Sequence, residues 1–239
     1  MVAVVVPDLG APLRRASLEG GYVANGSGRG YYPSMKKENP KAFDVCIIGG
    51  AGHVGLPLGV SFALAGLRTV LFDINAKSVS CIKKGKFPFK EKNGDVSLRR
   101  TLKKNMLTAV TGPASVISKS DVVMLVVGTP VDEYLNPKFG SLERVIEKYM
   151  SYFRDGQILV LRSTIFPGTS ERVQNLFRKR GVRVSVAFCP ERIVEGKALE
   201  ELASMPQIIS GFDKETTQRM QILFNAISKG GVVKASPLE

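Results

Sequence analysis

Apolar and polar positions follow two rhythms from residue 41 onward. Short β-branched runs predict strands near 44–49, 69–73, 107–110, 121–127, 157–162, 183–188, 206–210 and 231–234. Segments with helical spacing of apolar residues predict helices near 53–66, 76–84, 97–105, 141–153, 168–180, 196–203 and 213–228. Alternation of strands and helices is typical of an α/β fold with a doubly wound, mostly parallel sheet and helices on both faces.

Residues 1–40 follow neither rhythm. Glycine, serine and charged residues gather in Gly20-Gly21, in 25–30 and in 36–40. Such segments supply too little apolar surface for a packed core. We therefore expect a disordered or irregular N-terminal tail, followed by one domain over 41–239.

Gly50, Gly52 and Gly55 form a Gly-x-Gly-x-x-Gly pattern directly after the first predicted strand, with His53 and Val54 between the last two glycines. Gly50 permits a tight turn, Gly52 lets the backbone approach a pyrophosphate, and Gly55 lets the next helix pack close to the strand. The helix N-terminus favours an anion through its unpaired N–H groups and positive dipole end. The pattern indicates a Rossmann-like dinucleotide-binding unit.

Asp73 closes the second predicted strand, 21 positions after Gly52. Its carboxylate is placed to accept hydrogen bonds from ribose hydroxyls, and its charge would repel a 2′-phosphate. The predicted cofactor is therefore NAD rather than NADP. Lys77 is the nearby cation that would argue for NADP, but a lysine in the first turn of a helix is usually solvated.

Polar and turn residues follow three later strands, where a doubly wound sheet binds its ligand. They lie in Val126–Glu133, Leu161–Thr169 and Ala187–Gly196. Each segment alone could be an ordinary loop, because glycine and proline end strands everywhere. Three of them at one edge, beside a dinucleotide turn, favour a ligand site.

Composition narrows the class of protein. A 239-residue chain with 44% hydrophobic residues and a mean hydropathy of +0.05 is typical of a globular domain. Its apolar runs are shorter than the ~18–20 residues of a spanning helix, and Val2–Val6 lacks the basic flank of a signal peptide. We expect a soluble, cytoplasmic protein without a membrane partner. Cys46, Cys81 and Cys189 show no metal-ligand spacing, which indicates buried or spectator thiols and no metal.

The net charge of +13 is unevenly distributed. Between residues 83 and 104, Glu91 and Asp95 stand against nine basic residues: Lys83, Lys84, Lys86, Lys90, Lys92, Arg99, Arg100, Lys103 and Lys104. These form either a solvated surface or a positive rim that attracts a phosphate-bearing substrate. Nucleic-acid binding is a third interpretation, which we do not expect because the chain has no recognisable nucleic-acid module and few interleaved aromatic residues.

From Phe43 to Glu239 the chain resembles the NAD-binding domain of the nucleotide-sugar dehydrogenases, the family of UDP-glucose, GDP-mannose and UDP-N-acetylmannosamine dehydrogenases. The resemblance rests on Gly50–Gly55, Gly128-Thr129-Pro130, Ser163-Thr164 followed by Pro167-Gly168, and Pro190-Glu191-Arg192 with Glu195-Gly196. Residues 127–137 and the Pro-Glu-Arg triplet are more similar to the branch that acts on UDP-N-acetylhexosamines than to the UDP-glucose branch.

The resemblance implies an NAD-dependent oxidoreductase of polysaccharide biosynthesis. Such enzymes oxidise the C6 alcohol of a UDP-sugar twice, to a uronic acid, through an aldehyde captured by a cysteine. It assigns Thr164 to positioning a catalytic water, Glu191 to activating that water, and Glu195 to the surroundings of substrate and nicotinamide. Arg192, with Glu191, is expected to contact the UDP-sugar. The implied cofactor contacts are Gly50, Gly52, His53, Val54, Gly55, Asp73, Thr129, Pro130 and Ser163.

Family members continue beyond the segment that matches 235–239 into a long helix with a catalytic lysine and asparagine, and then into a substrate domain with the nucleophilic cysteine. We therefore expect this chain to stop before that helix and to lack the full oxidation on its own. The long helix also makes much of the dimer contact, so the homo-oligomer of the full-length family stays open here. Two alternatives remain: a non-catalytic NAD-binding module, and a different NAD-dependent dehydrogenase. The second would need another catalytic base, and His53, the single histidine, lies inside the glycine turn.

Overall fold

The computed structural model describes residues 42–128 and 139–236, in which strands and helices mostly alternate. The strands are β1 (Phe43–Ile48), β2 (Thr69–Phe72), β3 (Leu107–Val110), β4 (Ser120–Leu125), β5 (Ile158–Leu161), β6 (Ser185–Phe188), β7 (Gln207–Gly211) and β8 (Val232–Lys234). The α-helices are α1 (Gly55–Leu64), α2 (Ala76–Lys83), α3 (Gly94–Lys103), α4 (Phe139–Tyr149), α5 (Thr169–Lys179), α6 (Ala198–Ser204) and α7 (Lys214–Asn225). Every predicted strand and helix is confirmed, with small shifts at the ends.

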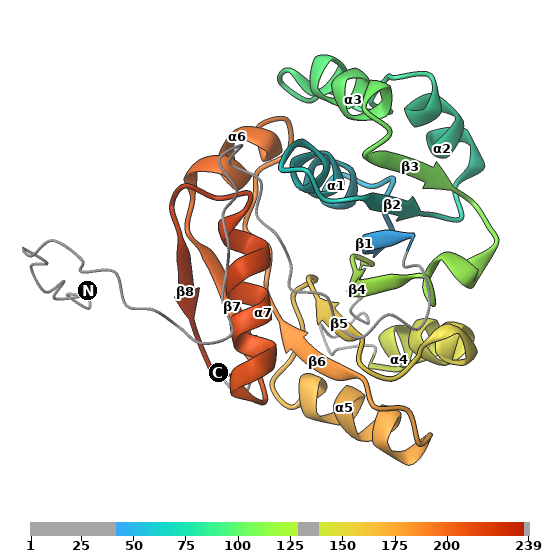
Figure 1. Ribbon diagram of the computed structural model, residues 1–239, viewed down its shortest axis with the longest axis vertical. Helices are drawn as coiled ribbons and strands as arrows, with labels where there is room; N and C mark the ends of the chain where they lie inside the picture. Colours follow the sequence, from blue (N-terminus) through green and yellow to red (C-terminus); the bar gives the residue numbers. More distant parts are fainter. Residues whose placement is uncertain (1–41, 129–138, 237–239) are drawn as a thin grey trace, which may run out of the picture. The chain divides into compact units, whose positions relative to one another are not determined.

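The strands form one sheet in the order β3-β2-β1-β4-β5-β6-β7-β8 (Figure 1). The six strands from β3 to β6 in this spatial order each run parallel to their neighbours, which confirms the predicted doubly wound sheet. β7 runs antiparallel to β6, and β8 runs parallel to β7. For two consecutive strands to run parallel, the connection between them must return from the end of the first strand to the edge where that strand began. The seven-residue α6 does not provide one, so β7 starts at the edge where β6 ends.

Both faces of the sheet are buried. Successive side chains of β1 point to opposite faces, so Val45 and Ile47 join one apolar cluster while Cys46 and Ile48 join the other. The first cluster packs against α1, α3, α6 and α7, and the second packs against α4 and α5 (Figure 1). This two-sided burial explains why the strands appear in the sequence as continuous apolar runs, and it confirms helices on both faces.

The predicted tail over residues 1–40 lies outside the described residues. Within the described ranges, the helices are all too short or too polar to cross a membrane.

Candidate cofactor and active site

The turn between β1 and α1 is packed tightly against its neighbours. Gly49 has a φ of +83°, and a Cβ there would collide with the carbonyl oxygen of Val126. At Gly50 a Cβ would lie 2.8 Å from the Leu71 Cα of β2, and at Gly55 it would lie 2.8 Å from the Cα of Gly50. The residue that needs the left-handed conformation is therefore Gly49, while Gly50 is required by its contact with β2.

Gly52 differs from the other glycines of this turn. An added Cβ would meet only the carbonyl oxygen of Gly49, at an ordinary 3.6 Å. The protein's own packing thus gives no reason for a glycine, whereas a pyrophosphate that approaches the backbone does. At the start of α1, Val54 provides no side-chain cap and the first turn has no acidic residue. Leu56 donates its N–H to the carbonyl oxygen of Gly52 at 3.0 Å and Pro57 has no N–H, so an anion would be met by N–H groups that precede Leu56 and by the positive end of the helix dipole. The turn thus fits a dinucleotide.

Asp73, at the end of β2, holds this turn in place. One carboxylate oxygen accepts the N–H of Ala51 at 2.9 Å, and the other accepts the N–H of Asn75 at 2.9 Å. Asn75 in turn caps the N-terminus of α2 through the N–H of Ser78. A carboxylate has about four acceptor positions, so Asp73 can hold the turn and still accept bonds from a ribose. The sequence pattern did not indicate this anchoring role.

The loop that follows β5 lies against the chain that follows β4. Ser163 donates its Oγ hydrogen bond to the carbonyl oxygen of Val127 at 2.6 Å, and Thr164 beside it is exposed. Thr129 and Pro130, two predicted cofactor contacts, lie outside the described residues. Ser163 therefore marks where the two loops meet at the carboxyl edge of the sheet.

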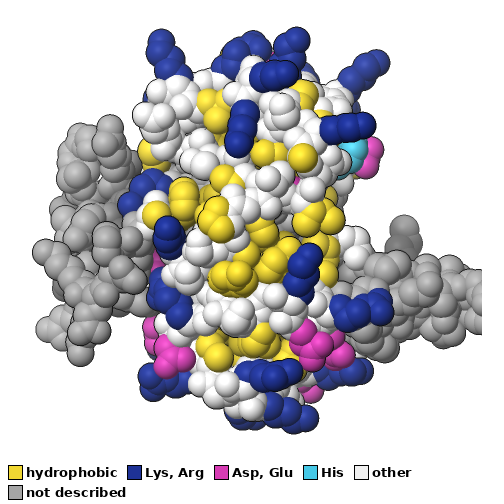
Figure 2. Space-filling view, turned by 90° about the vertical axis from the view of Figure 1, so that its right-hand side faces the viewer, with side chains coloured by type: hydrophobic (Ala, Val, Ile, Leu, Met, Phe, Trp, Pro, Cys, Tyr) yellow, Lys and Arg dark blue, Asp and Glu magenta, His cyan; other side chains and the backbone are white. Residues whose placement is uncertain are grey.

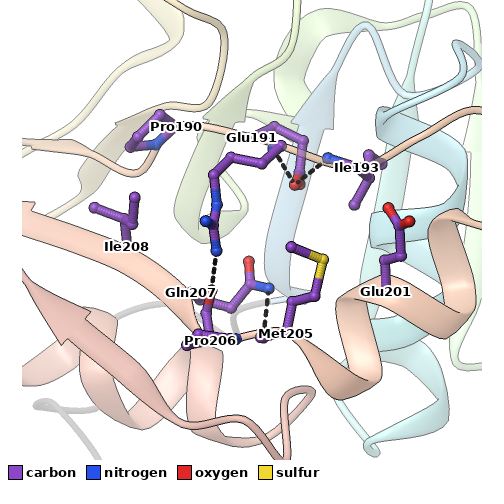
Figure 3. Close-up of a pocket in the computed structure, with 9 residues that line it drawn as sticks. Pro190, Glu191, Ile193, Glu201, Met205, Pro206, Gln207 and Ile208 are labelled. Carbon is purple, nitrogen blue, oxygen red and sulfur yellow. Dashed lines mark hydrogen bonds between the residues drawn. The ribbon is translucent and has the colours of Figure 1, made fainter. Parts of the chain in front are cut away.

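Glu191, after β6, forms an ion pair with Arg162, which directly follows β5. The Arg162 side chain is 0% exposed and that of Glu191 is 10% exposed. The other carboxylate oxygen of Glu191 accepts the N–H groups of Arg192, at 2.7 Å, and Ile193, at 3.2 Å (Figure 3). Three of the roughly four acceptor positions of this carboxylate are thus occupied.

Arg162 was not among the predicted site residues, although the sequence carried a signal for it. It directly follows the apolar residues of β5, which are buried in the centre of the sheet. An arginine buried there needs hydrogen-bond acceptors and a negative charge from another part of the chain, because burying an unpaired charge costs much free energy. The pattern therefore indicates a buried ion pair, but it does not identify the partner.

Arg192 extends in a different direction from Glu191. Its Nη2 donates to the carbonyl oxygen of Pro206 at 2.9 Å, in the turn between α6 and β7. The cavity between this turn and the Glu191 loop has a volume of about 10 Å³ (Figure 3). That is room for a single water molecule, so this cavity cannot hold a UDP-sugar. A larger hollow of about 550 Å³ lies between α1, α3, α6 and α7, and none of the predicted site residues lines it.

His53 connects the glycine turn to two other loops. Its ring stacks on Phe89, with centroids 4.0 Å apart and an angle of 24° between the planes. Its Nδ1 lies 3.7 Å from the Oε2 of Glu195, and the side chains of His53 and Glu195 are 48% and 75% exposed. The structure thus brings together two predicted site residues from opposite ends of the chain.

The cysteines are buried or half-buried free thiols, as predicted. Cys46 lies in β1 and Cys189 follows β6, and burial raises the pKa of each thiol to about 12. Because the thiolate is the nucleophilic form, neither residue is suited to capture an aldehyde. Cys81 lies half-buried on α2. In the part of the chain that the structure describes, no group of histidine, cysteine or acidic residues is arranged to hold a metal ion.

The nine basic residues of the predicted positive rim are all exposed. Lysine and arginine side chains gather at the end of the domain that carries α2 and α3 (Figure 2). Lys92 forms an ion pair with Glu200 at 2.9 Å, and Arg99 lies 3.9 Å from Asp95. The rim is therefore a charged surface beside the loop of Phe89.

A glycine turn that fits a pyrophosphate, an acidic residue at the end of β2 and polar loops at the carboxyl edge define an NAD-binding domain of the dehydrogenase class. The family model for the NAD binding domain of the UDP-glucose/GDP-mannose dehydrogenase family matches residues 43–228. The chain belongs to this family, and NAD is its cofactor. The alternative of an NAD-dependent dehydrogenase from a different family is thereby excluded.

Individual relatives agree with this assignment. The UDP-N-acetyl-D-mannosamine dehydrogenase of Methanocaldococcus jannaschii is 29% identical over 191 residues, which are 79% of this chain and 43% of that protein. The UDP-glucose 6-dehydrogenase of Pseudomonas aeruginosa is 30% identical over 70% of this chain and 38% of its own length. The solved UDP-D-ManNAc dehydrogenase of Pyrococcus horikoshii matches with a TM-score of 0.76 and 27% identity, over 82% of this chain and 47% of that structure. The chain thus spans about half the length of the proteins that it matches.

Proposed function

We propose that residues 41–239 are the cofactor-binding part of an NAD-dependent nucleotide-sugar 6-dehydrogenase. The proposed substrate is a UDP-sugar, UDP-N-acetylmannosamine or a related compound, whose C6 alcohol is oxidised to a carboxylate. The observation that carries the proposal is the open position at Gly52 in a turn whose other glycines are required by packing, since a pyrophosphate that approaches the backbone explains a glycine there. The names of the relatives, most of them UDP-N-acetyl-D-mannosamine dehydrogenases, support the choice of substrate.

In the proposed complex, Gly50, Gly52 and Gly55 and the start of α1 hold the pyrophosphate. Asp73 accepts bonds from the ribose and keeps the turn closed through Ala51. NAD, when bound, supplies the acceptor for the hydride that leaves the sugar alcohol. The charge of Asp73 disfavours the additional phosphate of NADP.

The proposed contacts near the nicotinamide come from the loops after β4, β5 and β6. Thr129, Pro130 and Ser163 face the cofactor, and Thr164 positions a water molecule. Glu191 keeps one acceptor position through which it can orient that water, and Arg192 meets the substrate. Glu195, exposed beside His53, lies on the side of the cofactor. A group that moves a proton must lie within hydrogen-bond reach of that proton. The proposal places the side chains of these three loops within such reach of the substrate and the water.

A second candidate is an NAD-binding module without turnover. The observation that favours it is the burial of Cys46 and Cys189, because the high pKa of both thiols removes them as nucleophiles. For either candidate the proposed compartment is the cytoplasm. Neither candidate involves nucleic acid or a membrane, and the proposal makes no choice of oligomeric state.

The experiment that tests the dehydrogenase mixes the purified chain with NAD and UDP-N-acetylmannosamine and follows the absorbance of NADH. UDP-glucose serves as the comparison substrate. Formation of NADH supports the dehydrogenase and ranks the sugars. NAD binding without NADH fits both a cofactor-binding part acting without the rest of the enzyme and the module, and an absence of NAD binding contradicts both.

A further inference from the structure

The Arg162 guanidinium lies at the centre of a buried network that joins three strands. It follows β5, and its Nη1 donates to the carbonyl oxygens of Cys189, at 2.9 Å, and Pro190, at 3.4 Å. Its Nη2 donates to Glu191 and to the Oε1 of Gln207, the first residue of β7, at 2.6 Å. A planar fork of donors can reach these acceptors together, which a single ammonium group cannot.

The opposite side of the guanidinium is closed by an aromatic ring. The Arg162 Cζ lies 4.8 Å from the centroid of Phe224 on α7, within the range of a cation–π contact. The ion pair with Glu191 therefore sits between the sheet and α7 and has no access to bulk water at the arginine. In such surroundings the geometry of the pair is tightly fixed, because breaking it would leave a charge unpaired.

This network determines the path of the chain after β6. Two backbone hydrogen bonds continue the pairing of β5 and β6 into the segment 189–194: the N–H of Cys189 donates to the carbonyl oxygen of Leu161 at 3.0 Å, and the N–H of Glu191 donates to that of Arg162 at 3.1 Å. In addition, Arg162 holds the carbonyl groups of Cys189 and Pro190, and Glu191 accepts the N–H groups of Arg192 and Ile193. The ion pair thus adds side-chain bonds to the last backbone bonds of the β5–β6 pairing, and it fixes the chain where that pairing ends.

The same segment leads to the cofactor-binding edge. Glu195 follows it directly and lies 3.7 Å from His53 of the glycine turn. Lys92 donates its N–H to the carbonyl oxygen of Gly196 at 3.1 Å, and Glu91 accepts the N–H of Leu199 at 3.0 Å. A displacement at Glu191 would therefore reach the loops that surround the glycine turn.

We propose that Arg162 is a positioning residue, which holds Glu191 and the 189–195 segment against the nicotinamide side of the cofactor site. This inference rests on the proposed function, since that function places Glu195 beside the cofactor. Arg162 itself touches neither cofactor nor substrate in the proposal. Its effect passes through Glu191 and the carbonyl groups of Cys189 and Pro190.

The test compares the binding of NAD with that of ADP-ribose, which lacks the nicotinamide, in the unaltered chain and in Arg162→Lys. ADP-ribose needs only the glycine turn and Asp73, so its affinity should stay within about twofold. NAD should lose about tenfold in affinity in Arg162→Lys, because displacing the 189–195 segment removes about one hydrogen bond's contribution to binding at the nicotinamide end. Calorimetry on the whole chain measures both ligands under the same conditions.

Arg154→Lys is the matched control. Arg154 also bridges carbonyl groups and a carboxylate, through the carbonyl oxygens of Ser118 and Ser120 and the Oδ1 of Asp121. It lies where β4 begins, at the opposite edge of the sheet. This variant should leave the ratio of NAD to ADP-ribose affinity unchanged.

Equal losses for NAD and ADP-ribose in Arg162→Lys, or no loss for either, would overturn the proposal. A chain that binds neither ligand before any substitution contradicts the proposed function instead. If Arg162→Lys does not fold, amide hydrogen exchange in the unaltered chain still tests whether the 189–195 segment is held in place. The N–H groups of Arg192 and Ile193 should be protected although they lie in a loop, and rapid exchange at both would contradict a fixed segment.

Discussion

The glycine turn after β1 and the segment after β6 face the same edge of the sheet, but they are built in different ways. The turn consists of backbone packed against backbone, where Gly49, Gly50 and Gly55 leave no room for a Cβ. The segment 189–195 is built around a buried ion pair whose partners, Arg162 and Glu191, are 29 positions apart. The first design acts through steric contact with Leu71 of β2 and with Val126 after β4, and the second acts through a charge pair between the loops after β5 and β6.

This difference affects how each region tolerates change. A substitution in the turn acts through steric contact, so its effect depends on where the added atoms lie. A substitution in the segment acts through charge, because removing one partner leaves the other buried and unpaired. A substitution in the turn can therefore change cofactor binding without changing the stability of the fold, whereas a substitution in the segment should change both.

Gly52→Val should have the largest effect on function. Its Cβ meets only the Gly49 carbonyl oxygen at 3.6 Å, so the chain should fold, yet the side chain fills the approach of the pyrophosphate. Calorimetry with NAD should show no binding, while circular dichroism shows a native fold. Gly49→Ala is the contrast, because the left-handed φ of +83° alone costs about 1–2 kcal/mol. Normal NAD binding by Gly52→Val would show that the cofactor is placed wrongly.

Glu191→Leu should have the largest effect on stability. It leaves the fully buried Arg162 without its carboxylate, which costs about 3–5 kcal/mol. Urea unfolding followed by circular dichroism measures the difference. Glu195→Leu is the matched control on the same loop; that side chain is 75% exposed, so its change should stay within about 0.5 kcal/mol. Similar small losses for both variants would contradict the ion-pair account.

Asp73→Ala should weaken NAD binding by about tenfold, because bonds worth about 1–2 kcal/mol to the ribose and to the Ala51 N–H are lost. Asp73→Asn keeps an acceptor but removes the charge, so it should mainly reduce the preference for NAD over NADP. Calorimetric titration of both cofactors gives this ratio. A ratio that is the same in Asp73→Asn as in the unaltered chain would argue against the charge as the selector.

Thiol labelling should give the smallest but simplest contrast. Burial raises the pKa of Cys46 and Cys189 to about 12, so their reactive thiolate forms are absent between pH 7 and pH 9 in the folded chain. A disulfide reagent at pH 8 should therefore react with Cys81 alone. In guanidinium chloride all three thiols should react. Fast labelling of three thiols in the native chain would mean that the two strands are not packed as described.

The fold could be predicted largely from the sequence because both faces of the sheet are buried. This leaves continuous apolar strand runs between amphipathic helices, which mark each element without knowledge of its partners. The direction of β7 could not be predicted, since a strand reads alike in either direction. The predicted start of α3 is three residues too late, because the helix follows Asn93, with a φ of 58°, and begins at Gly94, where a Cβ would lie only 3.0 Å from the Phe87 ring.

The candidate site could be predicted only in its local parts. The spacing of Gly50, Gly52 and Gly55 and the position of Asp73 are fixed by one strand-turn-helix-strand unit, so a sequence pattern captures them. The pairing of Arg162 with Glu191 and the contact of His53 with Glu195 depend on the order of strands in the sheet. No local pattern records that order, and these contacts emerged only with the structure.

The most direct test of the central claim is a calorimetric titration of the unaltered chain with NAD and with NADP. The glycine turn and Asp73 predict one NAD per chain and an affinity for NADP that is at least about tenfold lower, since the 2′-phosphate would meet the Asp73 carboxylate. Equal affinities would contradict the role of Asp73. An absence of NAD binding would contradict the account of the turn as a cofactor site.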